Sequence, residues 1–176
     1  PRQHGIVGNK WFLKSGVTSP EYAVVDRDYH TIGVPAGAMA TGKSPRAVVG
    51  SMIGDELKLA DHRSRVSSVS LKDSAAIFLG GKNPDGVYWW DIATGRFVTS
   101  DYYRADLPDY IQTVNEERWN DRYLGQVWDE LLPAEAYAGM HPVRTDWLPL
   151  LAKVGNEFPH EMASQPGILY NTMVYG

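Results

Sequence analysis

Helical and extended segments alternate in this sequence, and that alternation restricts the fold more than any other feature. A buried sheet covered by helices requires such an order of elements, so the expected class is α/β. The expected elements are a helix over residues 44–62, a strand over residues 65–72, a short helix or turn over residues 73–81, and a hairpin over residues 86–103 whose turn is Ala93-Thr94-Gly95.

The first helix has a recognisable start. Ser44 can cap the helix, and Pro45 can take the first helical position, where a missing N–H is tolerated. Apolar residues then recur at helical spacing, which predicts one buried stripe. They are Val48, Val49, Met52, Ile53 and Leu59.

A second, more polar helix is expected from Asp109, and Pro133 should end it. The inward positions that its pattern suggests are Ile111, Val114, Trp119 and Tyr123. The remainder has weak periodicity and resembles an irregular insertion. We therefore expect residues 1–113 to form a region of sheet and helices, and residues 114–176 to form a helical or irregular insertion.

Tyr88, Trp89 and Trp90 form an aromatic run within the expected hairpin. Aromatic side chains in strands commonly make cross-strand contacts, so packing is the favoured interpretation and a sugar-binding platform is the alternative.

Composition excludes several classes of function. The chain has 176 residues, enough for one good core, and its net charge of −4 gives no support for a nucleic-acid surface. Cysteine is absent, and no apolar run is long enough to cross a membrane. The first residues contain neither an initiator methionine nor a signal peptide, so we expect the sequence to be cut from a longer protein. The oligomeric state is left open.

One segment matches the pattern of a phosphate-binding loop. Gly37, Gly42, Lys43 and Ser44 satisfy G-x-x-x-x-G-K-[ST], which by itself suggests a nucleotide binder. The preceding run is short and interrupted by proline, and Pro45 lacks the N–H that a phosphate oxygen would need. We expect that this segment does not bind nucleotides.

Other polar residues give weaker indications. The five histidines show no ligand spacing, so no metal site is expected in this chain. Asp26 and Asp28 lie close together in a loop-like segment, and a solvated turn explains them about as well as a functional role does. Ser70 and Ser74 flank Lys72, but no histidine partner is indicated for a serine nucleophile.

Lys72 stands at the end of the expected strand over residues 65–72. Ligands collect outside the carboxyl ends of strands in open α/β sheets, so this lysine is a candidate for binding an anion. A lysine that simply extends into solvent is the alternative. Pattern alone does not decide between them.

Five blocks of the sequence resemble the phosphate-irrepressible alkaline phosphatases, which belong to the alkaline phosphatase superfamily near the type I phosphodiesterase/nucleotide pyrophosphatase branch. The blocks occur in the family's order. They are HGIVGNKW (residues 4–11), SPRAVVGSMIGDELKLA (44–60), SVSLKDSAAIFLGGK (68–82), YWWDIATGRFVTSDYY (88–103) and LPDYIQTVNEE (107–117).

The resemblance implies a partial three-layer α/β/α domain with a cap insertion, a phosphate ester substrate and export to the periplasm or beyond. In the family, two zinc ions activate a threonine nucleophile, and an asparagine, a lysine and an arginine hold the phosphoryl group. The asparagine corresponds to Asn9 and the lysine to Lys72. The family's arginine is replaced by Ser74, and the alternative is that a neighbouring cation, for example Arg46 or Lys82, fills its place.

The nucleophile block would precede Pro1, and the metal-binding blocks would follow Gly176 or have diverged. The resemblance therefore implies a zinc-dependent phosphoric ester hydrolase of which this chain is an inactive piece without nucleophile or metal ligands. The alternatives are a non-enzymatic phosphate-binding or interaction module, and a nucleotide binder that uses residues 37–44.

Overall fold

The computed structural model describes residues 2–6, 8, 10–12, 20–35, 40–140 and 158–161. The chain divides into two compact units, one of residues 1–91 with 96–116 and the other of residues 92–95 with 117–176.

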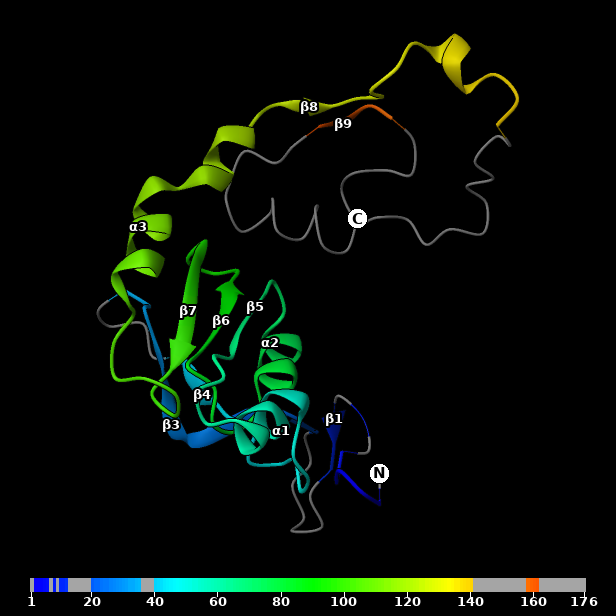
Figure 1. Ribbon diagram of the computed structural model, residues 1–176. Coiled ribbons are helices and arrows are strands. Elements are labelled where there is room, and N and C mark those ends of the chain that lie inside the picture. Colours follow the sequence, from blue (N-terminus) through cyan, green and yellow to red (C-terminus); the bar gives the residue numbers. More distant parts are fainter. Residues whose placement is uncertain are drawn as a thin grey trace. The chain divides into compact units, whose positions relative to one another are not determined.

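The first unit is built on a five-stranded mixed sheet with the order β4-β3-β7-β6-β5 (Figure 1). Strands β5 and β6 are parallel, and the other neighbours are antiparallel. The strands are β3 (Val25–Ile32), β4 (Thr41–Lys43), β5 (Ser67–Ser70), β6 (Gly86–Asp91) and β7 (Arg96–Ser100), and a separate pair consists of β1 (Lys10–Trp11) and β2 (Glu21–Tyr22).

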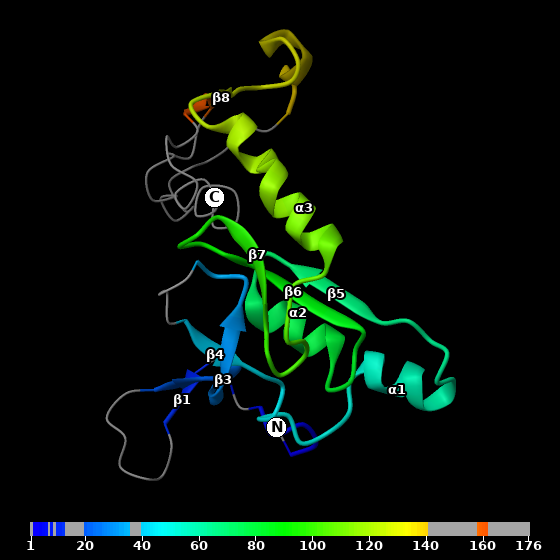
Figure 2. The ribbon, with the colours of Figure 1, turned by 90° about the vertical axis from the view of Figure 1, so that its left-hand side faces the viewer.

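Helices lie on both faces of this sheet, as two views show (Figures 1 and 2). Helix α2 (Asp73–Gly80) covers one face, and α1 (Ile53–Ala60) packs beside it. Helix α3 (Asp109–Glu117) covers the other face, where Asn115 bonds to both backbone groups of Phe97. The expected α/β class is confirmed, and the described part of this unit has three layers.

The main core lies between α2 and the sheet. Side chains alternate between the two faces of a strand, so Val87 and Trp89 of β6 point toward α2 while Tyr88 and Trp90 point toward α3. The buried core cluster consists of Val24, Ala76, Ile77, Val87, Trp89 and Val98.

The hairpin of β6 and β7 was predicted correctly. Trp89 pairs with Val98 and Trp90 with Phe97, and Gly95 in the turn has a φ of 65°, which glycine adopts without strain. Tyr88 and Trp89 are buried. The prediction that the aromatic run serves packing is therefore confirmed.

The helix predicted from Ser44 begins nine residues later, at Ile53. Ser44 does not cap a helix: its N–H donates to the carbonyl of Val24 at 2.9 Å, and its hydroxyl donates to Asp26 at 2.6 Å. These long-range bonds hold the segment against β3. The helix instead starts after Met52, whose N–H donates to the Asp55 carboxylate at 3.0 Å.

The predicted buried stripe of this helix was wrong except at Val48 and, in part, Met52. Ile53 and Leu59 are 68% and 77% exposed, and Val49 outside the helix is also exposed. The buried face of α1 consists of Gly54 and Asp55 instead. A Cβ on Gly54 would lie 2.5 Å from the carbonyl oxygen of Gly80, so α1 approaches α2 where side chains are smallest.

The helix predicted from Asp109 to Pro133 is much shorter, because α3 ends at Glu117. Arg118 has a φ of 46°, a left-handed conformation that interrupts the helix. Ile111 is buried as predicted, but Val114, Trp119 and Tyr123 are exposed. The other buried residue of α3 is Asn115, a polar residue that apolar periodicity does not find.

The second unit contains short elements in its described part. Two 3₁₀ helices and one antiparallel pair of strands are present, and Trp128, Phe158 and His160 make mutual ring contacts. The elements are η1 (Trp119–Tyr123), β8 (Val127–Trp128), η2 (Ala134–Tyr137) and β9 (His160–Glu161).

Candidate phosphate-binding site

Lys72 occupies the N-cap position of α2, directly after β5. Because β5 is parallel to β6, this end of the strand is the edge of the sheet where α/β proteins bind ligands. The lysine side chain is half-buried, and among the described residues no acidic side chain pairs with its ammonium group. Within the part of the chain that the structure describes, Lys72 thus presents a cation without an acidic partner at the start of a helix.

Asp73 follows and accepts hydrogen bonds on both carboxylate oxygens. Oδ1 accepts from the Tyr22 hydroxyl at 3.1 Å and from the N–H of Ser74 at 2.6 Å. Oδ2 pairs with the ammonium group of Lys43. The side chains of Lys43 and Asp73 are only 24% and 14% exposed, so this ion pair is largely shielded from water.

Ser74 is buried in the first turn of α2, with its Oγ 3.0 Å from the Tyr22 hydroxyl. A serine hydroxyl carries no charge, so position 74 contributes no cation. The structure thus places Lys72 and Ser74 in one helical turn. Asn9 lies outside the described residues.

Neither cation considered as a substitute for the missing arginine stands beside Asp73. Arg46 pairs with Asp28 at 2.7 Å and Asp26 at 3.3 Å, and these carboxylates raise the pKa of its guanidinium group. Lys82 follows the opposite end of α2, separated from Lys72 by a helix about 12 Å long. Lys43 is the cation that contacts Asp73, and the sequence had drawn attention to it only as part of the phosphate-loop pattern.

The phosphate-loop pattern does not have the structure that such a loop requires. Gly42 and Lys43 lie in β4, and α1 begins only at Ile53, so no helix N-terminus follows the motif. Gly42 is needed for close strand approach, because a Cβ there would lie 2.1 Å from the Tyr29 carbonyl. Residues 36–39 lie outside the described residues.

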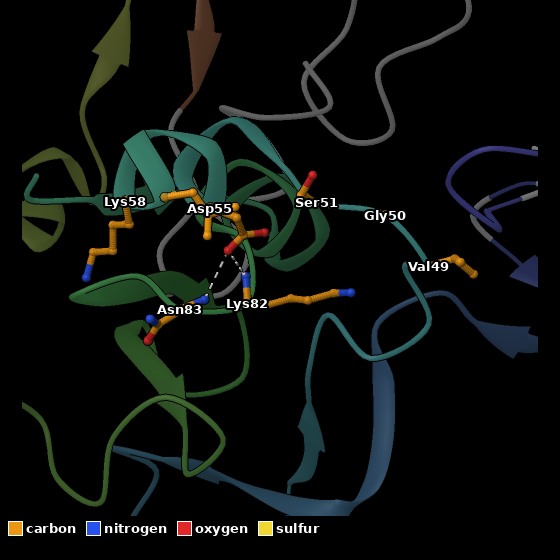
Figure 3. A pocket seen from close by; sticks show the side chains of 8 residues that line it. Val49, Gly50, Ser51, Asp55, Lys58, Lys82 and Asn83 are labelled. Atoms are coloured by element: carbon orange, nitrogen blue, oxygen red, sulfur yellow. Dashed lines mark hydrogen bonds between the residues drawn. The ribbon is translucent and has the colours of Figure 1, made fainter. Parts of the chain in front are cut away.

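A pocket of about 430 Å³ lies between the start of α1 and the end of α2 (Figure 3). Its acidic residue, Asp55, is buried and accepts from the N–H groups of Met52, Lys82 and Asn83. The side chains of Lys58 and Lys82 extend away from each other (Figure 3). The polar groups of this pocket therefore do not converge on one ligand.

Lys58 lines the pocket, but its ammonium group forms a structural ion pair. It pairs with Asp85 at 3.0 Å. The Val66 N–H and the Lys58 ammonium group hold the pKa of the Asp85 carboxyl well below its usual range, so this carboxylate stays charged at neutral pH. We assign the pocket a structural role, the joining of α1 to the turn after α2.

No cluster of three or more His, Cys, Asp or Glu side chains that could hold a metal ion occurs in the described ranges. The residues that the structure places thus do not form a zinc site. Within the same ranges, no helix combines the length and apolar character needed to cross a bilayer.

Two known proteins with similar sequences are alkaline phosphatases. The chain is 37% identical over 140 residues to alkaline phosphatase PhoV of Synechococcus elongatus, an alignment that covers 78% of this chain and 24% of PhoV. It is 33% identical over 162 residues to alkaline phosphatase PafA of Elizabethkingia meningoseptica, covering 91% of this chain and 29% of PafA. No protein-family model matches the chain.

The comparison of folds points to the same kind of protein as the comparison of sequences. The crystal structure of wild-type PafA matches with a TM-score of 0.77 and 32% identity over 92% of this chain and 31% of PafA. A PafA variant with four substitutions, of a threonine, an asparagine, a lysine and an arginine, matches equally well. The α/β fold of this chain is thus shared with an alkaline phosphatase.

The chain belongs to the alkaline phosphatase superfamily, which confirms the resemblance seen in the sequence. It spans between 24% and 31% of the length of these relatives.

Proposed function

We propose that this chain is part of a larger phosphoric ester hydrolase of the alkaline phosphatase type and holds the phosphoryl group during its transfer. The observation that carries the proposal is the ammonium group of Lys72 at the end of β5, which pairs with no acidic side chain among the residues that the structure describes. Phosphoryl transfer proceeds largely through positioning and charge stabilisation, so a preplaced cation at the nonbridging oxygens lowers the barrier. Asn9 would donate a further hydrogen bond to the same group.

The PafA variant supports these two assignments. Its substituted residues include an asparagine, and then a lysine and an arginine two positions apart. Lys72 and Ser74 have the same spacing here, and Asn9 precedes them. We therefore propose Asn9 and Lys72 as phosphate-binding residues, with Ser74 in the place of the arginine.

Other parts of the active site are proposed to come from elsewhere in the intact protein. The family resemblance implies a threonine nucleophile activated by two zinc ions, and the described residues offer no such metal cluster. Residues 114–176 are proposed to contribute to a cap over the substrate; most of them belong to the second compact unit. Export to the periplasm or the exterior is a further proposal from the resemblance.

The test is a comparison of phosphate monoesters with diesters in the intact protein. A monoester is a dianion and gains most from a second cation, so Ser74→Arg should raise its kcat/KM about thirtyfold or more relative to that for a diester. Aryl phosphate and bis-aryl phosphate are assayed with added zinc, and Ser74→Ala is the control that changes the side chain without adding charge. Residues 1–176 alone should show no turnover.

The ratio of the two kcat/KM values is the informative quantity. Ser74 is buried beside Tyr22, so an arginine there can lower the folded fraction, but that fraction cancels in the ratio. An unchanged ratio would show that position 74 does not contact the phosphoryl group. Absence of zinc-dependent hydrolysis by the intact protein would contradict the proposed function and favour a non-enzymatic phosphate-binding module.

A further inference from the structure

Lys72 has a carboxylate as its immediate neighbour in sequence, and this arrangement poses an electrostatic problem. An ionised Asp73 would attract the Lys72 ammonium group and repel a phosphate dianion. Lys72 is therefore available to an anionic ligand only if another group already pairs with the Asp73 carboxylate.

The structure shows how Asp73 is occupied. The Tyr22 hydroxyl and the Ser74 N–H donate to Oδ1, and Lys43 pairs with Oδ2. Two of these donors are neutral, so Lys43 supplies the opposing charge. The carboxylate is 14% exposed, which limits its access to counterions from solvent.

Lys43 is held in place by its own strand. Its backbone lies opposite Val25 in the pairing of β4 with β3. The next residue, Ser44, is fixed by bonds to the Val24 carbonyl and the Asp26 carboxylate. The side chain of Lys43 thus reaches Asp73, which is 30 positions away in the sequence.

We propose that Lys43 is a positioning residue that neutralises Asp73 and so leaves Lys72 available to a phosphate dianion. The inference rests on the proposed function, because it assumes that Lys72 binds phosphate. Lys43 itself does not contact the anion. Its effect is exerted through Asp73, which distinguishes it from a second phosphate-binding lysine.

The experiment measures the Kd of inorganic phosphate for the intact, zinc-loaded protein by isothermal titration calorimetry. Lys43→Met should weaken binding about tenfold, because the freed carboxylate then competes for Lys72. Lys43→Arg should bind within about threefold of wild type, since the charge is kept. Adding Asp73→Asn to Lys43→Met should also restore binding to about that level, because the carboxylate is gone.

The double variant separates this role from the alternatives. If Lys43 contacted phosphate directly, then removing the Asp73 charge would not restore affinity, and that result would overturn the inference. Arg46→Met is the matched control, because Arg46 is three residues away and pairs with Asp26 and Asp28 instead. It should leave the Kd unchanged, and thermal melting confirms that each variant is folded.

Lys72→Ala distinguishes the failure of this inference from the failure of the proposed function. If Lys72→Ala weakens phosphate binding while Lys43→Met does not, Lys43 has no positioning role and the phosphate site stands. If Lys72→Ala leaves binding unchanged, the proposed phosphate site is wrong, and the role of Lys43 is rejected with it.

Discussion

Replacing Lys72 with alanine in the intact protein should lower kcat/KM for an aryl phosphate about a hundredfold to a thousandfold. Loss of one charge-assisted contact to the transition state typically costs roughly this much in rate. The structure supports a large effect, because no acidic side chain in the described ranges already compensates the ammonium group. Lys72→Arg should recover part of the activity, since the charge is retained with a different geometry.

Lys82→Ala is the matched control for this experiment. Lys82 follows the other end of α2 and uses its backbone N–H, which the substitution retains, to bind Asp55 at 2.7 Å. Its removal should leave kcat/KM within about twofold of wild type, as expected for a surface charge far from the reaction. Equal losses for the two variants would mean that net charge, and not the position of Lys72, governs the rate.

Asp55→Ala should cause a large loss of stability. Three backbone N–H groups, those of Met52, Lys82 and Asn83, would lose their charged acceptor, and we expect the free energy of unfolding to fall by about 3–5 kcal/mol. Urea denaturation followed by tryptophan fluorescence measures the change. A loss below about 1 kcal/mol would show that water replaces the carboxylate at low cost.

Asp55→Asn is the informative partner of that variant. An asparagine keeps one oxygen acceptor in nearly the same volume, so the free energy of unfolding should fall by about half as much as in Asp55→Ala. The side chain at position 55 has little room to shift, because the backbone of Gly81 packs closely against it. Gly81 has a φ of 87°, and a Cβ there would lie 2.6 Å from Asp55 Oδ1. An asparagine variant as unstable as the alanine variant would indicate that the negative charge, and not hydrogen-bond number, stabilises this junction.

The elements that sequence predicted well are those set by local pattern. The hairpin of β6 and β7 and the helix at residues 73–80 follow from β-branched runs, a glycine turn and small residues. The predicted helix start at Ser44 was wrong because the hydroxyl of Ser44 donates a hydrogen bond to Asp26 and does not cap a helix. The apolar stripe of α1 failed because its buried contact is made by Gly54, which no hydrophobic pattern contains.

The candidate site was only partly predictable. Lys72 and Ser74 were proposed through a family resemblance, since the strand-end position of the lysine left a solvated role open. Lys43 and Tyr22 were missed because their contacts with Asp73 join residues 30 and 51 positions apart. Such contacts depend on how β2 and β4 fold against α2, and spacing within the sequence does not encode them.

We propose that Asn9 and Lys72 bind one phosphoryl group, and a crystal structure of the intact protein with inorganic phosphate tests this assignment. Lys72 Nζ and Asn9 Nδ2 should both lie about 3 Å from oxygens of the same phosphate ion. A phosphate ion bound elsewhere, or one contacted by neither side chain, would contradict it.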